Sequence, residues 1–117
     1  MNHGLSAVTV AKIHGVLDRH PEVEQAILYG SRAKGNFKPG SDIDLTLVGS
    51  SGLDERTRGR IDDELDDLLL PYEFDLSVFG QLKHPELIDH IRRVGVVVYE
   101  RTQAARPRLP VNPSGST

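Results

Sequence analysis

The sequence predicts a single α/β (α+β) domain, in which a small mixed β-sheet carries its helices mainly on one side. Two observations predict this fold class. Segments in which apolar residues recur with the helical period alternate with segments of strand period, which gives the order α-β-α-β-α-β-α-β over residues 6–99. A length of 117 residues fits one domain, so we expect no separate substrate-binding domain.

The first half of the chain supplies two helices and two strands. Residues 6–20 are expected to form a helix, because their apolar residues share one side. Residues 23–29 end in a short apolar run, which indicates a buried strand. Residues 31–34 would open a short helix, and the glycines and proline of 35–40 indicate a loop. Residues 41–48 alternate apolar and polar side chains and predict the second strand.

The second half repeats the alternation. Residues 54–70 predict the longest helix, and residues 72–79 the strand that follows it. A last helix begins at His84 and Pro85 and is followed by a strand over residues 96–99. We expect the longest helix to bury Ile61, Leu65, Leu68 and Leu69, and its acidic residues to be solvated.

The end of the chain differs from the rest in composition. From Arg101 onward it is rich in proline and poor in apolar residues, which predicts a disordered tail. We therefore place the folded domain at residues 1–100 and the tail at residues 101–117.

Composition excludes several function classes. The net charge of −3 argues against a general nucleic-acid-binding protein, which would be basic. The absence of cysteine excludes a disulfide framework and thiol catalysis. We see no signal peptide and no apolar run long enough to span a membrane, and we expect a cytoplasmic protein. The histidines show no metal-ligand spacing, so we expect all of them at surface or helix-cap positions.

The most informative segment is GSRAKGNFKPGSDID, residues 30–44. Gly30 permits a turn at the end of the first strand, and Ser31 adds a hydroxyl donor to free backbone N–H groups, which together suit a triphosphate. Arg32 and Lys34 are the cations nearest to these phosphates, while we expect Lys38 to be solvated and Tyr29 to pack in the core.

The Asp-x-Asp at the end of this segment predicts a metal site. Alternate residues of a strand face the same way, so Asp42 and Asp44 would lie on one face with their Cα atoms roughly 7 Å apart. Two carboxylates about 4 Å apart repel by on the order of 4 kcal/mol at an effective dielectric near 20. A divalent cation removes this repulsion, and carboxylates together with substrate phosphates commonly hold Mg²⁺.

These residues resemble a known family. The segment is similar to the signature G-S-x10-D-x-D of the polymerase-β-like nucleotidyltransferase superfamily, and YGSRAKG…SDIDL resembles its minimal nucleotidyltransferase (MNT) branch. The resemblance implies the nucleotidyltransferase fold over roughly residues 5–100, with ATP as substrate and two Mg²⁺ ions. It also implies a third acid on a later strand, acting as a metal ligand, a general base or both. We match Asp75 to this acid, with Glu73 as the competing base.

The resemblance further implies a function. MNT proteins act as antitoxins, and this chain would transfer AMP from ATP to a hydroxyl, expected to be a tyrosine of a HEPN-domain RNase toxin. Three alternatives remain open: an antitoxin that acts only by binding, a nucleotide-sensing module, and a small-molecule nucleotidyltransferase with a separate substrate-binding subunit.

Overall fold

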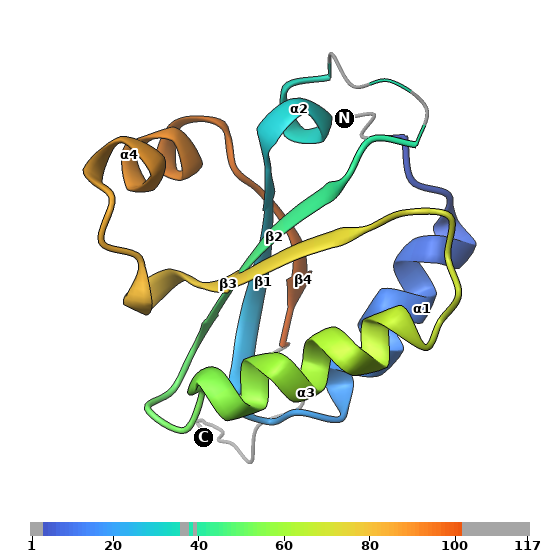
Figure 1. The fold of residues 1–117 in the computed structure, drawn as a ribbon, viewed down its shortest axis with the longest axis horizontal. Helices are drawn as coiled ribbons and strands as arrows, with labels where there is room; N and C mark the ends of the chain where they lie inside the picture. The colour runs from blue at the N-terminus through green and yellow to red at the C-terminus, as the bar shows by residue number, and fades with distance from the viewer. Residues whose placement is uncertain (1–3, 36–37, 39, 102–117) are drawn as a thin grey trace, which may run out of the picture.

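The computed structural model describes residues 4–35, 38 and 40–101, and Figure 1 shows their arrangement. Its elements, in chain order, are α1 (Ala7–Asp18), β1 (Val23–Tyr29), α2 (Gly30–Lys34), β2 (Ile43–Gly49), α3 (Glu55–Asp66), β3 (Phe74–Val78), the 3₁₀ turn η1 (Phe79–Gln81), α4 (Pro85–Val94) and β4 (Val96–Glu100). The predicted order of helices and strands is confirmed. The predicted tail beyond residue 101 lies outside the described residues.

The four strands form one mixed sheet in the order β3-β2-β1-β4. Strand β1 runs antiparallel to both β2 and β4, while β2 and β3 are parallel. A parallel pair needs a long crossover connection, and α3 supplies it between β2 and β3. The predicted mixed sheet is therefore confirmed, and the crossover brings the starts of β2 and β3 to the same end of the sheet.

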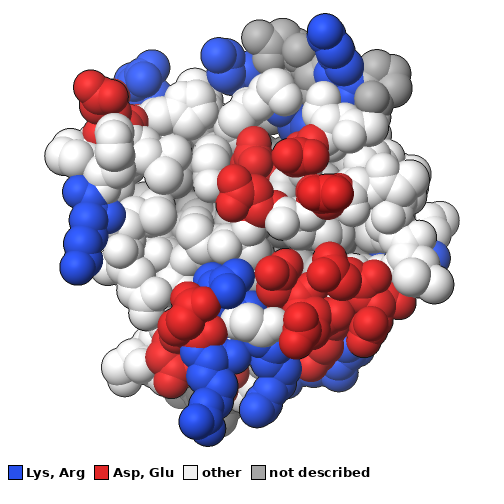
Figure 2. Space-filling view, in the orientation of Figure 1, with Lys and Arg blue, Asp and Glu red and all other residues white. Residues whose placement is uncertain are grey.

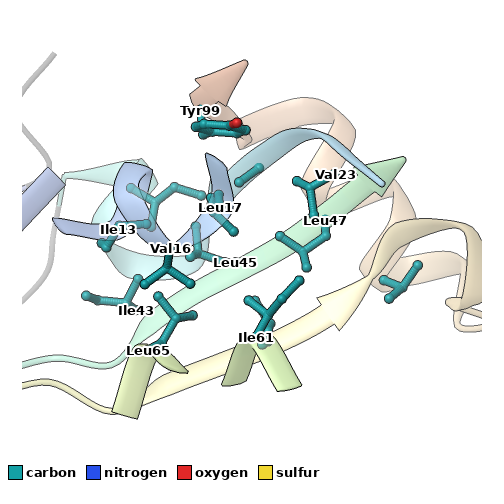
Figure 3. Packing of buried hydrophobic residues seen from close by; sticks show 14 of the residues in the cluster. Ile13, Val16, Leu17, Val23, Ile43, Leu45, Leu47, Ile61, Leu65 and Tyr99 are labelled. Atoms are coloured by element: carbon teal, nitrogen blue, oxygen red, sulfur yellow. The ribbon is translucent and has the colours of Figure 1, made fainter. Parts of the chain in front are cut away.

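The core lies between one face of the sheet and the helices α1 and α3. Figure 3 shows Val16 of α1 and Ile61 and Leu65 of α3 turned toward the central strand β2. All of these side chains are at most 1% exposed. Apolar residues of β2 alternate along this face, and Ile43, Leu45 and Leu47 are almost completely buried. The periodicity that predicted the elements thus also determines which face of the sheet is covered.

Helix α4 lies over part of the opposite face. Its His90 ring meets the ring of Tyr29 edge to face, with centroids 6.2 Å apart. Gly95, which ends α4, approaches the side chain of Ile27 on the same face of β1. The helices therefore cover mainly one face of the sheet, as predicted, while α4 packs over part of the opposite face. No described helix has the length and apolar character needed to cross a membrane.

Several element boundaries differ from the prediction by one to four residues. Strand β2 begins at Ile43 and β3 at Phe74, each two residues later than expected. Helix α3 ends at Asp66 instead of residue 70, and Leu69 adopts a positive φ of 58° with 88% of its surface exposed. The predicted burial of Leu69 is wrong. Pro71 disfavours helical geometry at the residue before it, so the chain must leave the helix before the strand begins.

The prediction for the histidines holds only in part. His84 caps α4, where its Nδ1 accepts a hydrogen bond from the Leu87 N–H. His20 is only 7% exposed and its Nε2 donates to Glu64 at 3.0 Å, so its predicted surface position is wrong. His14 is partly buried and donates to the Val98 carbonyl at 2.6 Å. Each partly buried ring has a partner contributed by an element distant in the sequence, which local spacing does not reveal.

Arg101 belongs to the folded domain and not to the predicted tail. Its backbone N–H donates to the Glu24 carbonyl at 2.8 Å. Its guanidinium donates to the carbonyl oxygens of Val23, Leu17 and His20 at 2.9–3.2 Å. These bonds satisfy carbonyls at the end of α1 and extend the sheet pairing by one residue.

Tyr99 makes the stability of the fold depend on pH in the alkaline range. Burial first, and then the hydrogen bond to Asp18, raise the pKa of Tyr99 from 10.0 to about 12. Its contribution to stability is therefore complete below pH 10, where both states are protonated, and is lost as the pH rises toward about 12. Tyr99→Phe should cost about 1–2 kcal/mol at neutral pH, because it removes the hydrogen bond to Asp18.

Denaturant unfolding at several pH values tests this expectation. Between pH 10 and 12, the free energy of unfolding should fall less steeply in Tyr99→Phe than in the wild type. The unfolding free energy of Tyr99→Phe should still fall somewhat over this pH range, because burial also raises the pKa of Tyr29. Identical slopes in the two proteins would show that Tyr99 does not carry this pH dependence.

Candidate active site

The turn at Gly30 joins the last residue of β1 to α2. Gly30 has a φ of 76°, which L side chains rarely adopt, so the predicted turn is confirmed. A Cβ atom at this position would overlap Oδ2 of Asp44. The backbone of the turn therefore packs directly against a carboxylate of β2. Ser31 is the next residue in the chain after Gly30.

Asp44 and Asp75 lie side by side on neighbouring strands. They are register partners in the parallel pair β2–β3. Asp42 and Glu73 each stand one residue before the first pair of that register, Ile43 and Phe74. Figure 2 shows acidic side chains gathered over β2 and β3 near the middle of the view, apart from a second acidic cluster along α3.

Burial and the neighbouring carboxylates raise the pKa of Asp44. Burial is the largest cause, followed by repulsion from Asp75 and then from Asp42, while His90 opposes the shift. Among the ion pairs of the described residues, none involves Asp42, Asp44 or Asp75. Asp75 is the register partner of Asp44, whereas Glu73 lies before the first register pair. This favours Asp75 over Glu73 as the acid that shares a site with Asp44.

Hydroxyl groups and an aromatic ring lie beneath these carboxylates. Ser77, two residues after Asp75, donates to the Thr46 hydroxyl at 2.9 Å. Burial raises the pKa of Tyr29, a hydrogen bond with Ser77 lowers it, and the charges of Asp75 and Asp44 raise it further. Tyr29 is 7% exposed, so its predicted packing role is confirmed, and its hydroxyl forms a hydrogen bond with Ser77.

His90 is a residue of this site that the sequence analysis missed. It contacts Tyr29 and is close enough to Asp44 to lower its pKa. The available signal was helical spacing, since His90 follows Leu87 by three residues and precedes Val94 by four, on the inward side of α4. Nothing in that spacing indicates which strand the inward side meets.

Arg32 is held inside the fold by a backbone carbonyl and an aromatic ring. It is only 1% exposed, and its Nε and Nη2 donate to the Ser41 carbonyl at 3.1 and 3.0 Å. Its guanidinium lies 4.7 Å from the centre of the Tyr72 ring. These partners give Arg32 a structural role, and its predicted phosphate contact stays a prediction. Lys34 and Lys38 are both exposed, as expected for Lys38.

The chemistry of the acidic group fits a hard divalent cation. Carboxylate oxygens are the ligands that Mg²⁺ prefers, and the repulsion that raises the pKa of Asp44 would be relieved by a bound cation. In the part of the chain that the structure describes, no three His, Cys, Asp or Glu side chains are gathered closely enough to hold an ion as they stand. The carboxylates thus provide suitable ligands but not a closed cage.

Two comparisons relate the sequence to known proteins. A family model described as "Polymerase beta, Nucleotidyltransferase" matches residues 11–104. A protein of Haemophilus influenzae named "Probable protein adenylyltransferase MntA" is 33% identical over 73 residues, which are 62% of this chain and 63% of that protein. An aminoglycoside (3'')(9) adenylyltransferase of Klebsiella pneumoniae is 40% identical over 58 residues, 48% of this chain. The match spans only 22% of that enzyme's length.

Solved structures share the fold. A toxin–antitoxin complex with AMP-PNP contains a chain that matches with a TM-score of 0.65 and 22% identity, over 86% of this chain and 78% of that one. A tri-AMPylated Shewanella oneidensis HEPN toxin in complex with MNT antitoxin matches with a TM-score of 0.61 and 20% identity, over 83% and 74% of the two chains. At this level of identity, the likeness establishes the fold.

Proposed function

Because this chain belongs to the polymerase-β-type nucleotidyltransferase family, whose model matches residues 11–104, we propose that it transfers AMP from ATP to a protein hydroxyl. The observation that carries this proposal is the convergence of three segments at one end of the sheet. The Gly30 turn packs on Asp44, and Asp44 is the register partner of Asp75. A phosphate-binding turn and two carboxylates therefore share one site.

Each group has a distinct task in this reaction. The Ser31 hydroxyl and the backbone N–H groups that follow Gly30 bind the triphosphate, and the exposed Lys34 is a further phosphate contact. The acceptor oxygen attacks the α-phosphorus, a new P–O bond forms, and the bond between the α- and β-phosphates breaks to release pyrophosphate. Asp75 takes the proton of the acceptor hydroxyl.

Magnesium is the metal that this set of ligands would hold, with Asp42, Asp44 and Asp75 as its protein ligands. When bound, it would acidify the attacking hydroxyl and neutralise charge on the departing pyrophosphate. The carboxylates would hold the triphosphate near the Gly30 turn only through this bound cation, and Tyr29 and His90 line the side of the site that α4 covers.

We further propose that the acceptor is a tyrosine of a HEPN-domain toxin, which this chain binds and silences as an antitoxin. Support comes from the relatives, one named for protein adenylylation and one solved with an AMPylated HEPN toxin. The described domain is small, and a protein acceptor would supply the part of the binding surface that such a domain lacks.

A transfer assay tests this function. The chain is incubated with ATP, Mg²⁺ and a HEPN-domain protein, and mass spectrometry should find the mass of AMP added to a tyrosine. An α,β-methylene ATP analogue should give no product because its α–β bridge does not break, whereas the β,γ-imido analogue should support transfer. A partner that binds tightly but stays unmodified would favour an antitoxin that acts by binding alone.

The aminoglycoside relative motivates a second candidate, transfer to a small hydroxyl compound. The same assay separates the two functions when the partner protein is replaced by a panel of small hydroxyl compounds. Efficient modification of such a compound with no protein acceptor present would contradict the antitoxin proposal.

A further inference from the structure

We propose that Arg32 is a positioning residue, which fixes Asp42 relative to Asp44 and Asp75 and so sets the geometry of the metal-binding carboxylates. The inference deepens the proposed function and rests on it for its kinetic consequence. Its structural basis is a set of contacts with the two segments that lead into β2 and β3.

The first contact fixes the peptide bond directly before Asp42. The Ser41 carbonyl, which accepts both guanidinium hydrogen bonds, belongs to the bond that joins Ser41 to Asp42. Asp42 lies before the first residue of β2, so the pairing of the strands does not hold it. The Ser41 hydroxyl also accepts from the Lys38 N–H at 2.9 Å, which closes the turn from the other side.

The second contact holds the start of β3. The guanidinium lies over the ring of Tyr72, which directly precedes Glu73. The Glu73 carbonyl accepts the Ile43 N–H at 2.8 Å, next to the first register pair of β2 and β3. One buried side chain from α2 thus contacts both chain segments that carry the carboxylates.

The chemistry of arginine suits this place. A planar guanidinium can donate two converging hydrogen bonds to one oxygen and stack on a ring at the same time, whereas an ammonium is a compact charge without a fixed fork of donors. Burying a charge is costly, so a buried arginine that only filled space would be unfavourable. Arg32→Lys keeps the charge and removes the fork, and it is therefore the informative change.

The chain contains a matched control. Arg101 also donates to backbone carbonyls, and its guanidinium lies 6.0 Å from the ring centre of Tyr99. It contacts the beginning of β1, whereas the candidate site lies at the end of β1. Arg101→Lys should therefore destabilise the fold in a comparable way without reaching the carboxylates.

The experiment compares Arg32→Lys, Arg101→Lys and the wild type by thermal unfolding, Mn²⁺ titration and transfer kinetics. Arg32→Lys should weaken Mn²⁺ binding and lower kcat, each by about 10- to 100-fold, as for residues that orient metal ligands. The KM for ATP should change less than kcat. Tyr72→Leu should shift both quantities in the same direction, and Arg101→Lys should keep wild-type values despite a lower Tm.

Mn²⁺ affinity decides the inference independently of catalysis. If the wild type binds Mn²⁺ but transfers no nucleotide, the proposed function fails while the comparison of affinities still stands. Unchanged Mn²⁺ affinity in Arg32→Lys would overturn the positioning role. Equal losses in Arg32→Lys and Arg101→Lys would overturn it too, as would a wild type that does not bind Mn²⁺.

Discussion

Asp44→Asn should abolish nucleotide transfer and at the same time raise the thermal stability of the ligand-free protein. Activity should fall by at least about 100-fold, because an amide replaces a charged metal ligand. Stability should rise because the raised pKa of Asp44 reflects burial and repulsion by Asp75 and Asp42, both of which penalise the ionised form. Transfer assays and thermal unfolding at neutral pH measure the two effects.

The sign of the pH dependence follows from the same shift. A carboxyl group whose pKa is higher in the folded state stabilises the fold at acid pH and loses that contribution as the pH rises through the raised pKa. The advantage of Asp44→Asn should therefore shrink as the pH is lowered. Asp63→Asn, which removes an exposed charge on α3, is the control and should leave nucleotide transfer unchanged. A destabilised Asp44→Asn would contradict this account.

Gly30→Ala adds a single methyl group to this site and should lower both the stability of the fold and the rate of nucleotide transfer. The alanine must adopt the φ of 76° that glycine has at this position. Its Cβ atom would also overlap Oδ2 of Asp44. We expect the sum of backbone strain and overpacking to reach about 2–5 kcal/mol. Displacement of the Asp44 carboxylate should also abolish nucleotide transfer. Chemical denaturation and the transfer assay measure the two losses.

Gly35 provides the matched control for this change. It has a similar φ of 84°, but a Cβ there meets nothing within 4 Å. Gly35→Ala should therefore show only the backbone cost, about 1–2 kcal/mol, with transfer retained. Combining Gly30→Ala with Asp44→Ala should reduce the cost of the alanine to that same value, because only an ordinary contact of 3.6 Å to the Asp44 Cβ remains. Equal costs at Gly30 and Gly35 in the otherwise unchanged protein would refute the close packing.

The two substitutions probe opposite consequences of one arrangement. Ionised Asp44 is unfavourable to the ligand-free fold, and glycine at position 30 is the residue type that lets the Gly30 turn approach it. Stability is thus given up at the position where a cation and a triphosphate would supply compensating interactions. A bound metal and nucleotide should consequently stabilise the wild type more than Asp44→Asn.

The sequence by itself determined the elements and the motif. Periodicity is a local property, so it predicted the order of helices and strands. The turn at Gly30 also follows locally, because glycine is the residue that adopts its φ without strain. The likeness of GSRAKG…SDID to a known signature indicated the family, which the match over residues 11–104 confirms.

Only the tertiary structure decided which side chains meet. The parallel pairing of β2 and β3 places Asp75 beside Asp44, and the packing of α4 brings His90 to the same face. The burial of Arg32 depends on Ser41 and Tyr72, which lie nine and forty residues away in the sequence. Spacing along the chain carries no record of these contacts, since the role of a charged side chain is fixed by the groups within a few ångströms of it in the folded protein.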